Sequence, residues 1–225
     1  MLWVGLVGDS WASGHKLDAP LARHLSARGV AATVVSSGHP GTTSRQIMRD
    51  MGAAPSTPGS SRELLMNGDL DCLVIIDGVN DTAGHMGSGF YAHHMVEMIG
   101  LCRRRGLPVF LVLEVPEYGI ESLPDTGWLS KAKHILFRYL FDGRQVNVIA
   151  AYRKALADAL IARPWDIPII SFSAVTTDYT ASTNLYANPS HLNGWGREAL
   201  AAAIADAAAA LADSMANVTK GATFF

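Results

Sequence analysis

Five short apolar segments alternate with helical segments along this chain of 225 residues. The apolar segments have the length of strands and are rich in valine, isoleucine and leucine; they are residues 2–7, 30–35, 70–76, 107–115 and 167–172. Strands buried on both faces give such continuous apolar runs, and helices between them connect strands that run in parallel. The alternation therefore predicts an α/β protein with a doubly wound, five-stranded parallel sheet.

Helices are expected between these strands, because apolar residues recur there at intervals of three and four positions. Glycine or proline follows several of these segments, as at Gly29, Gly106 and Pro164. We expect helices over residues 18–28, 89–105, 145–163 and 193–215. A short helix that carries Ile47, Met48 and Met51 is also expected, capped by one of residues 42–44. Residues 1–216 would then form a single domain, and residues 217–225 a loose C-terminal tail.

The composition bears on partners and location. The formal net charge is −2, and the one basic cluster, residues 103–105, ends a predicted helix, so we expect no nucleic-acid partner. No apolar run reaches the ~18 residues of a membrane-spanning helix. No export signal is visible either, so we expect a cytoplasmic protein without a membrane span. Cys72 and Cys102 lie in apolar segments and are expected to be buried core thiols.

Four polar loops follow strands of the predicted sheet, and such loops meet at one edge of a doubly wound sheet. They contain Ser10, Gly41, Asn80 and His191. Ser10 is a candidate nucleophile and His191 a candidate base, the two groups that acyl transfer by serine requires. The N–H groups of Ser10 and Gly41 and the amide of Asn80 are candidate donors to an oxyanion. The pattern indicates a serine-dependent acyl-transfer site.

No second chemistry is indicated by the remaining histidines and glycines. His93 and His94 are adjacent on a predicted helix and point to different faces, which makes them a poor pair of metal ligands. The loop between Gly8 and Gly14 lacks the spacing of a phosphate-binding P-loop. We therefore expect no metal site and no cofactor.

The four loops resemble the motifs of the SGNH (GDSL-type) hydrolases in residue type and order. Gly8-Asp9-Ser10 follows the first strand, Gly41 the second, Gly78-Val79-Asn80-Asp81 the third and His191 the fifth. The matched residues are few, but they span nearly the whole chain. The resemblance implies a flavodoxin-like α/β/α sandwich and metal-free hydrolysis of esters or thioesters. It also implies that Ser10, Gly41 and Asn80 form the oxyanion hole and that His191 is the base.

The chain departs from this family three residues before His191, where the family has an aspartate and this sequence has Asn188. An aspartate would stabilise the imidazolium by its charge, whereas an amide oxygen only accepts a hydrogen bond. Four interpretations are open. Asn188 or a backbone carbonyl orients a Ser–His pair; another acid, such as Asp178, reaches His191; Asn188 is an introduced replacement for aspartate; or the chain is an inactive relative kept for binding.

Residues 116–142 interrupt the alternation between the fourth strand and its helix. This segment leaves the sheet at the edge where the four polar loops meet, and much of it is apolar: Trp128, Leu129, Ile135, Leu136, Phe137, Tyr139, Leu140 and Phe141. It could form a subdomain packed on its own apolar residues, a lid or acyl-binding wall over the site, or a contact in a homodimer.

The expected substrate follows from the surroundings of Ser10. Polar, glycine-rich loops favour a short acyl group, such as acetyl, on a carbohydrate or another small alcohol, cleaved through an acyl-Ser10 intermediate. The apolar segment 116–142 favours instead a longer acyl chain, as in a thioesterase, a lysophospholipase-type hydrolase or an acyltransferase. A non-catalytic ligand-binding protein is the alternative that Asn188 leaves open.

Overall fold

The computed structural model has a five-stranded sheet at its centre, with the strand order β2-β1-β3-β4-β5. All neighbouring strands run in parallel, as the sequence predicts. The structure describes residues 1–52, 60–66, 70–107, 110–120, 128–143 and 147–221. The strands are β1 (Leu2–Gly8), β2 (Ala32–Gly38), β3 (Cys72–Ile76), β4 (Phe110–Leu113) and β5 (Ile169–Ile170).

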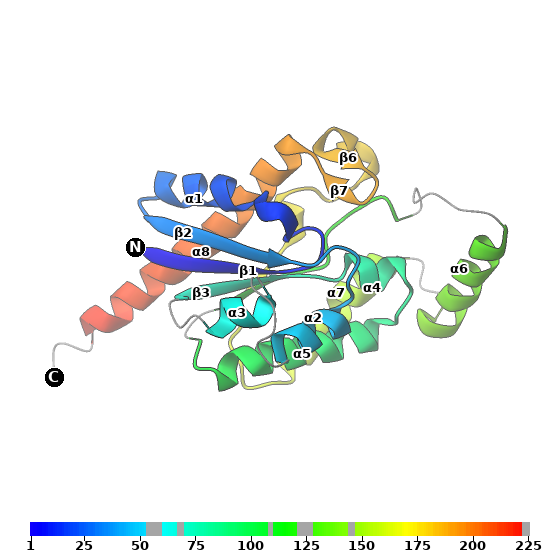
Figure 1. Ribbon diagram of the computed structural model, residues 1–225, viewed down its shortest axis with the longest axis horizontal. Helices are drawn as coiled ribbons and strands as arrows, with labels where there is room; N and C mark the ends of the chain where they lie inside the picture. Colours follow the sequence, from blue (N-terminus) through cyan, green and yellow to red (C-terminus); the bar gives the residue numbers. More distant parts are fainter. Residues whose placement is uncertain (53–59, 67–69, 108–109, 121–127, 144–146, 222–225) are drawn as a thin grey trace.

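Helices cover both faces of the sheet and give the molecule three layers (Figure 1). On one face, α1 (Asp18–Ala27) packs beside α8 (Gly194–Gly221). The helices of the other face are α2 (Ser44–Gly52), α3 (Ser61–Met66), α5 (Ser88–Arg104) and α7 (Val148–Ile161). The predicted fold class, a doubly wound α/β/α sandwich, is confirmed.

The core lies on both sides of the two central strands. Every residue of β3 is buried, and so are the last five residues of β1. Side chains such as Leu21 of α1 and Tyr91 of α5 cover these strands from opposite faces. Cys72 and Cys102 are buried free thiols. Because helices cover both faces of the sheet, the loops at the ends of the strands carry the polar groups available for function.

Several element boundaries differ from those expected. β2 begins two residues later than residue 30, and β5 contains only Ile169 and Ile170. Sequence periodicity does not reveal α3 or the short helix α4 (Val79–Ala83), because neither has enough turns to show a repeat. The expected end of the last helix is wrong, since α8 continues to Gly221 and residues 217–221 are helical.

Some expectations fall on residues outside the described ranges. They are residues 53–59 of a predicted loop, 108–109 of the fourth predicted strand, 121–127 of the segment 116–142, 144–146 at the start of a predicted helix, and 222–225 of the predicted tail. Within the ranges that the structure describes, no helix is long and apolar enough to cross a membrane.

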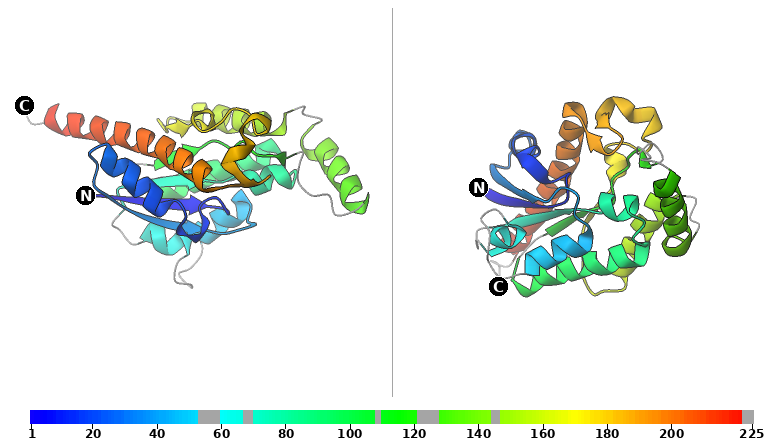
Figure 2. Two further views of the ribbon diagram at one scale, coloured as in Figure 1. Left: turned by 90° about the horizontal axis from the view of Figure 1, so that it is seen from above. Right: turned by 45° about the vertical axis from the view of Figure 1, so that its right-hand side comes forward.

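The segment 116–142 contains α6 (Trp128–Phe141), which stands apart from the three layers. Figures 1 and 2 show it beyond the carboxyl ends of the strands. Large apolar side chains along α6 are exposed, among them Trp128 and Ile135. This exposure does not fit a subdomain that buries its own apolar residues.

Gly8, the last residue of β1, lies beside Ile76 of β3. A Cβ atom at Gly8 would lie 1.7 Å from the carbonyl oxygen of Ile76. The N–H of the next residue, Asp9, donates to that same oxygen at 3.2 Å. The obstructing atom belongs to the backbone of a central strand and cannot turn aside as a flexible side chain would. Only glycine fits at the position that leads into Ser10.

We expect Gly8→Ala to lower the free energy of unfolding by about 3 kcal/mol or more, because the added methyl group would push the two central strands apart. Gly52→Ala, at the end of α2, is the matched control, since its Cβ would have no neighbour closer than 3.9 Å. Urea unfolding curves of both variants and the parent protein measure the difference. Equal stability of Gly8→Ala and the parent would contradict the close approach.

Candidate active site

Ser10 and His191 are 181 residues apart in sequence and are in hydrogen-bond contact in the structure. Ser10 lies in the turn that follows β1, and His191 begins the short strand β7 (His191–Leu192). The Ser10 Oγ and the His191 Nε2 are 3.0 Å apart. This distance suits transfer of the hydroxyl proton to the imidazole. The predicted nucleophile and base are therefore brought together.

Asn188 faces His191 because the two residues are paired across a small antiparallel hairpin. The hairpin consists of β7 and β6 (Tyr186–Asn188). The Oδ1 of Asn188 lies 3.1 Å from the Nδ1 of His191. When Nε2 accepts the Ser10 proton, Nδ1 must carry a hydrogen, and the amide oxygen of Asn188 is placed to accept it. Asn188 thus occupies the position of the orienting group and contributes no full charge.

Ser190 adds a second contact to the same imidazole nitrogen. Its Oγ lies 3.0 Å from the Nδ1 of His191, and its N–H donates to the Oδ1 of Asn188 at 3.0 Å. The indole N–H of Trp11 donates to the Ser190 carbonyl at 3.0 Å and so joins the turn after β1 to the hairpin. Ser190 and Trp11 are not among the site residues predicted from sequence, since a serine and a tryptophan beside a motif give no specific signal.

Asp178 is not placed to act as the acid behind His191. Its Oδ1 accepts a hydrogen bond from the N–H of Thr180 at 2.8 Å. It lines a different hollow, together with Glu117. Burial raises the pKa of Glu117, and repulsion between its carboxylate and that of Asp178 adds to the shift. Within the described residues no hydrogen bond or ion pair joins Asp178 to His191.

The backbone N–H groups of Ser10 and Gly41 are available to a ligand. Neither donates to an acceptor within the described part of the chain. Gly41 has a φ of 78°, a left-handed conformation that favours glycine, and a Cβ atom there would meet nothing within 4 Å. The open space beside Gly41 leaves its backbone accessible to a substrate oxygen, as the oxyanion prediction requires.

Asn80 is engaged by the protein itself. Its Nδ2 donates to the carbonyl of Thr42 at 2.9 Å and makes a longer contact of 3.4 Å to the Oδ2 of Asp9. The first bond attaches Asn80 to the loop that carries Gly41, and the second attaches it to the residue before Ser10. Of the two amide hydrogens, the one in the longer contact is the more readily available to an oxyanion.

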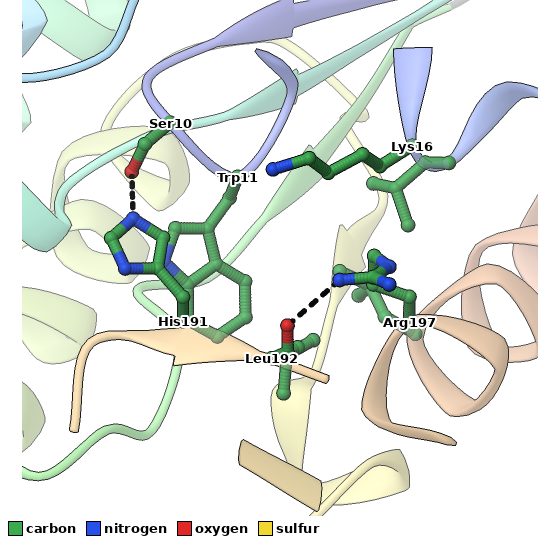
Figure 3. A pocket seen from close by; sticks show the side chains of 8 residues that line it. Ser10, Trp11, Lys16, His191, Leu192 and Arg197 are labelled. Carbon is green, nitrogen blue, oxygen red and sulfur yellow. Dashed lines mark hydrogen bonds between the residues drawn. The ribbon is translucent and has the colours of Figure 1, made fainter. Parts of the chain in front are cut away.

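A small hollow of about 30 Å³ opens beside Ser10 and His191. Apolar groups line much of it, including Leu17 and Leu200, and two cations, Lys16 and Arg197, also border it. Figure 3 shows Lys16 extending toward Trp11 and Arg197 donating to the Leu192 carbonyl. Lys16 is not among the site residues predicted from sequence. The sequence does not show in which direction the side chain of a lysine six positions after the nucleophile points.

The environment of His191 favours the neutral imidazole. Partial burial lowers the pKa of His191, and the positive charge of Lys16 lowers it further. Both effects act against the imidazolium form, the first by removing water and the second by repulsion. The imidazole is therefore free to accept a proton over a wider pH range than an exposed histidine.

Within the described ranges, no group of three or more His, Cys, Asp or Glu side chains is placed to hold a metal ion. The predicted pair His93 and His94 packs ring against ring, with centroids 5.0 Å apart. A hydrogen bond to the Phe90 carbonyl occupies the Nδ1 of His94. These contacts account for both residues as parts of α5.

No protein-family model matches the sequence, and no curated protein sequence matches it. Solved structures do. A lipase/acylhydrolase from Enterococcus faecalis superposes with a TM-score of 0.66 at 18% identity, over 93% of this chain and 96% of that one. A carbohydrate acetylesterase from Sinorhizobium meliloti gives 0.63 at 17%, over 94% and 100%. The aryl esterase of M. smegmatis gives 0.62 at 18%, also over 94% and 100%. The chain therefore has the fold of the SGNH (GDSL-type) hydrolases, the fold that its sequence motifs predict.

Proposed function

We propose that this protein is a serine ester hydrolase with Ser10 as nucleophile and His191 as base. The observation that carries the proposal is the 3.0 Å contact between the Ser10 Oγ and the His191 Nε2, at the sheet edge where free backbone N–H groups also lie. A nucleophile, a base in contact with it and donors for an oxyanion are the parts that acyl transfer needs. The esterases and acylhydrolases among the similar structures support the same class.

In the proposed reaction, His191 Nε2 takes the proton of Ser10 while Oγ attacks the ester carbonyl carbon. The carbonyl oxygen becomes an oxyanion, which accepts hydrogen bonds from the N–H groups of Ser10 and Gly41 and from Asn80. The alcohol leaves with the proton from His191, and an acyl-Ser10 ester remains. Water then gives a proton to His191 and attacks this ester, so that the carboxylic acid is released and Ser10 regains its proton.

We further propose a short acyl group, on a carbohydrate or another small alcohol, as the substrate. The hollow beside Ser10 is small, at about 30 Å³, well below the roughly 300–1,000 Å³ of pockets that hold drug-sized ligands. No residue within the described part of α6 lines it, so α6 gives no support to an acyl-binding wall. A longer-chain hydrolase, a thioesterase or an acyltransferase is the alternative within catalysis, and a ligand-binding protein is the alternative outside it. A cytoplasmic location remains part of the proposal.

We expect Ser10→Ala to reduce the hydrolysis of p-nitrophenyl acetate by at least about 10³-fold, because the covalent step is lost. Ser173→Ala is the control, since this exposed serine bonds to Ser171, away from His191. The rate of the parent protein should fall along a series of esters from acetyl to dodecanoyl. A Ser10→Ala variant that keeps the parent rate would contradict the serine mechanism, and faster hydrolysis of long chains would favour the longer-chain alternative.

We expect Asn188→Asp to raise turnover, by about tenfold at least and up to ~10⁴-fold, because a carboxylate stabilises the imidazolium that forms during the reaction. Asn188→Ala is the companion variant and should fall below the parent, because the Oδ1 contact to His191 is lost. Steady-state kinetics on p-nitrophenyl acetate give both values. Inactivity of both the parent and Asn188→Asp would favour the ligand-binding alternative.

We expect Lys16→Ala to move the acidic limb of the kcat/KM profile to higher pH. Removal of the positive charge raises the pKa of His191, so the base becomes protonated, and inactive, at a higher pH than in the parent. Lys16→Arg preserves the charge and should leave the limb in place. Because Lys16 also borders the hollow, its removal can change substrate binding and therefore the rate itself. The readout is accordingly the position of the acidic limb on the pH axis. An unshifted limb in Lys16→Ala would show that its charge does not act on His191.

A further inference from the structure

α6 presents an uncovered apolar face to solvent. At about 100° per residue, seven of its residues fall on one continuous arc of about 140°. In order around the helix they are Ile135, Trp128, Tyr139, Ala132, Leu136, Leu129 and Leu140. Each of the six large side chains in this arc is between 51% and 76% exposed. Monomeric soluble proteins seldom expose so many neighbouring large apolar side chains, and such patches mark interaction surfaces.

The C-terminal end of α6 is attached to the rest of the protein. Directly after the helix, the buried Asp142 pairs with the buried His85 and accepts a hydrogen bond from the Tyr152 hydroxyl at 3.0 Å. Outside the apolar arc, Phe137 is half-buried and Phe141 is exposed, and their rings pack edge to face at 5.5 Å. These contacts fix the end of the helix and leave the large side chains of the arc in solvent.

Cations border the apolar arc on both sides. Position 133 follows Leu140 around the helix, and position 131 precedes Ile135 at the other border. Both are lysine, and α6 contains no aspartate or glutamate. The whole chain carries a formal charge of −2, so this helix concentrates positive charge in an otherwise acidic protein. Apolar residues flanked by cations, with tryptophan and tyrosine among them, are typical of helices that lie in a membrane interface.

We propose that α6 docks this protein on the surface of an anionic lipid membrane. The apolar arc would enter the boundary between headgroups and acyl chains, while the bordering cations pair with lipid phosphates. A second copy of the chain fits this face less well, because two such arcs packed together would bring the cations of both helices side by side. α6 lies beyond the carboxyl ends of the strands, so docking would turn the sheet edge that carries Ser10 toward the membrane (Figure 1).

Co-sedimentation with vesicles tests the proposal and does not depend on catalysis, so Ser10→Ala should bind as the parent does. We expect the parent to bind vesicles of equal parts phosphatidylglycerol and phosphatidylcholine, and to bind phosphatidylcholine alone much more weakly. Ile135→Gln should weaken binding by about tenfold or more, because an apolar side chain no longer enters the lipid. Ile161→Gln is the matched control, since Ile161 is an isoleucine at the end of α7 that is more exposed than Ile135.

A separate variant tests the electrostatic contribution to vesicle binding. Lys133→Gln should weaken binding to the anionic vesicles by about fivefold and reduce its sensitivity to salt. Circular dichroism checks that the variants keep the parent's helix content. Absence of vesicle binding, equal binding to phosphatidylcholine alone, or equal weakening by Ile135→Gln and Ile161→Gln would each overturn the proposal. A dimer in light scattering that Ile135→Gln converts to a monomer, without vesicle binding, would assign the face to a second copy.

Discussion

Hydrogen bonds to two buried carboxyl groups fix the loops of the candidate site relative to one another. Asp9 is fully buried, accepts the N–H of Trp11 at 2.9 Å and contacts the amide of Asn80. Asp81, also buried, accepts the N–H and the hydroxyl of Ser44 at 2.8 and 2.7 Å. Asp9 thus joins the Ser10 turn to the start of α4. Asp81 joins α4 to the start of α2, just after Gly41. The positions of the nucleophile and its candidate oxyanion donors therefore depend on these two side chains.

The same burial gives the carboxyl cluster an unusual protonation. Burial raises the pKa of Asp9 from 3.8 to about 7, although the N–H of Trp11 opposes the shift. Burial and the neighbouring carboxylates also raise the pKa of Asp77, and burial raises the pKa of Asp81, although hydrogen bonds from Ser44 oppose that shift. The folded state then retains a proton on Asp9 that the unfolded chain releases above pH 3.8. The contribution of this proton to the free energy of unfolding is complete below that pH and is lost as pH rises through about 7. The loops that Asp9 joins are therefore less stable in alkaline solution.

Much of this arrangement follows from sequence because the strands are buried on both faces, which gives them continuous apolar runs. A parallel sheet then brings Ser10, Gly41, Asn80 and His191 to one edge whatever the details of the loops. The hairpin that sets Asn188 opposite His191 could not be predicted, since each of its strands has only two or three residues. The direction of Lys16 and the isolation of α6 from the core likewise depend on tertiary packing, and apolar residues alone do not say whether they will be covered.

Asn188 changes the electrostatics of the site while it keeps the geometry. An aspartate at this position would raise the pKa of His191 and oppose the effects of burial and of Lys16, which lower it. With an amide there, all the resolved influences act in one direction, toward a neutral imidazole. In the proposed reaction, such a base would be unprotonated at neutral pH, but the imidazolium that forms would have no compensating negative charge. Stabilisation of the transition state would then depend mainly on the candidate oxyanion donors. The two free N–H groups of Ser10 and Gly41 are where such stabilisation would act.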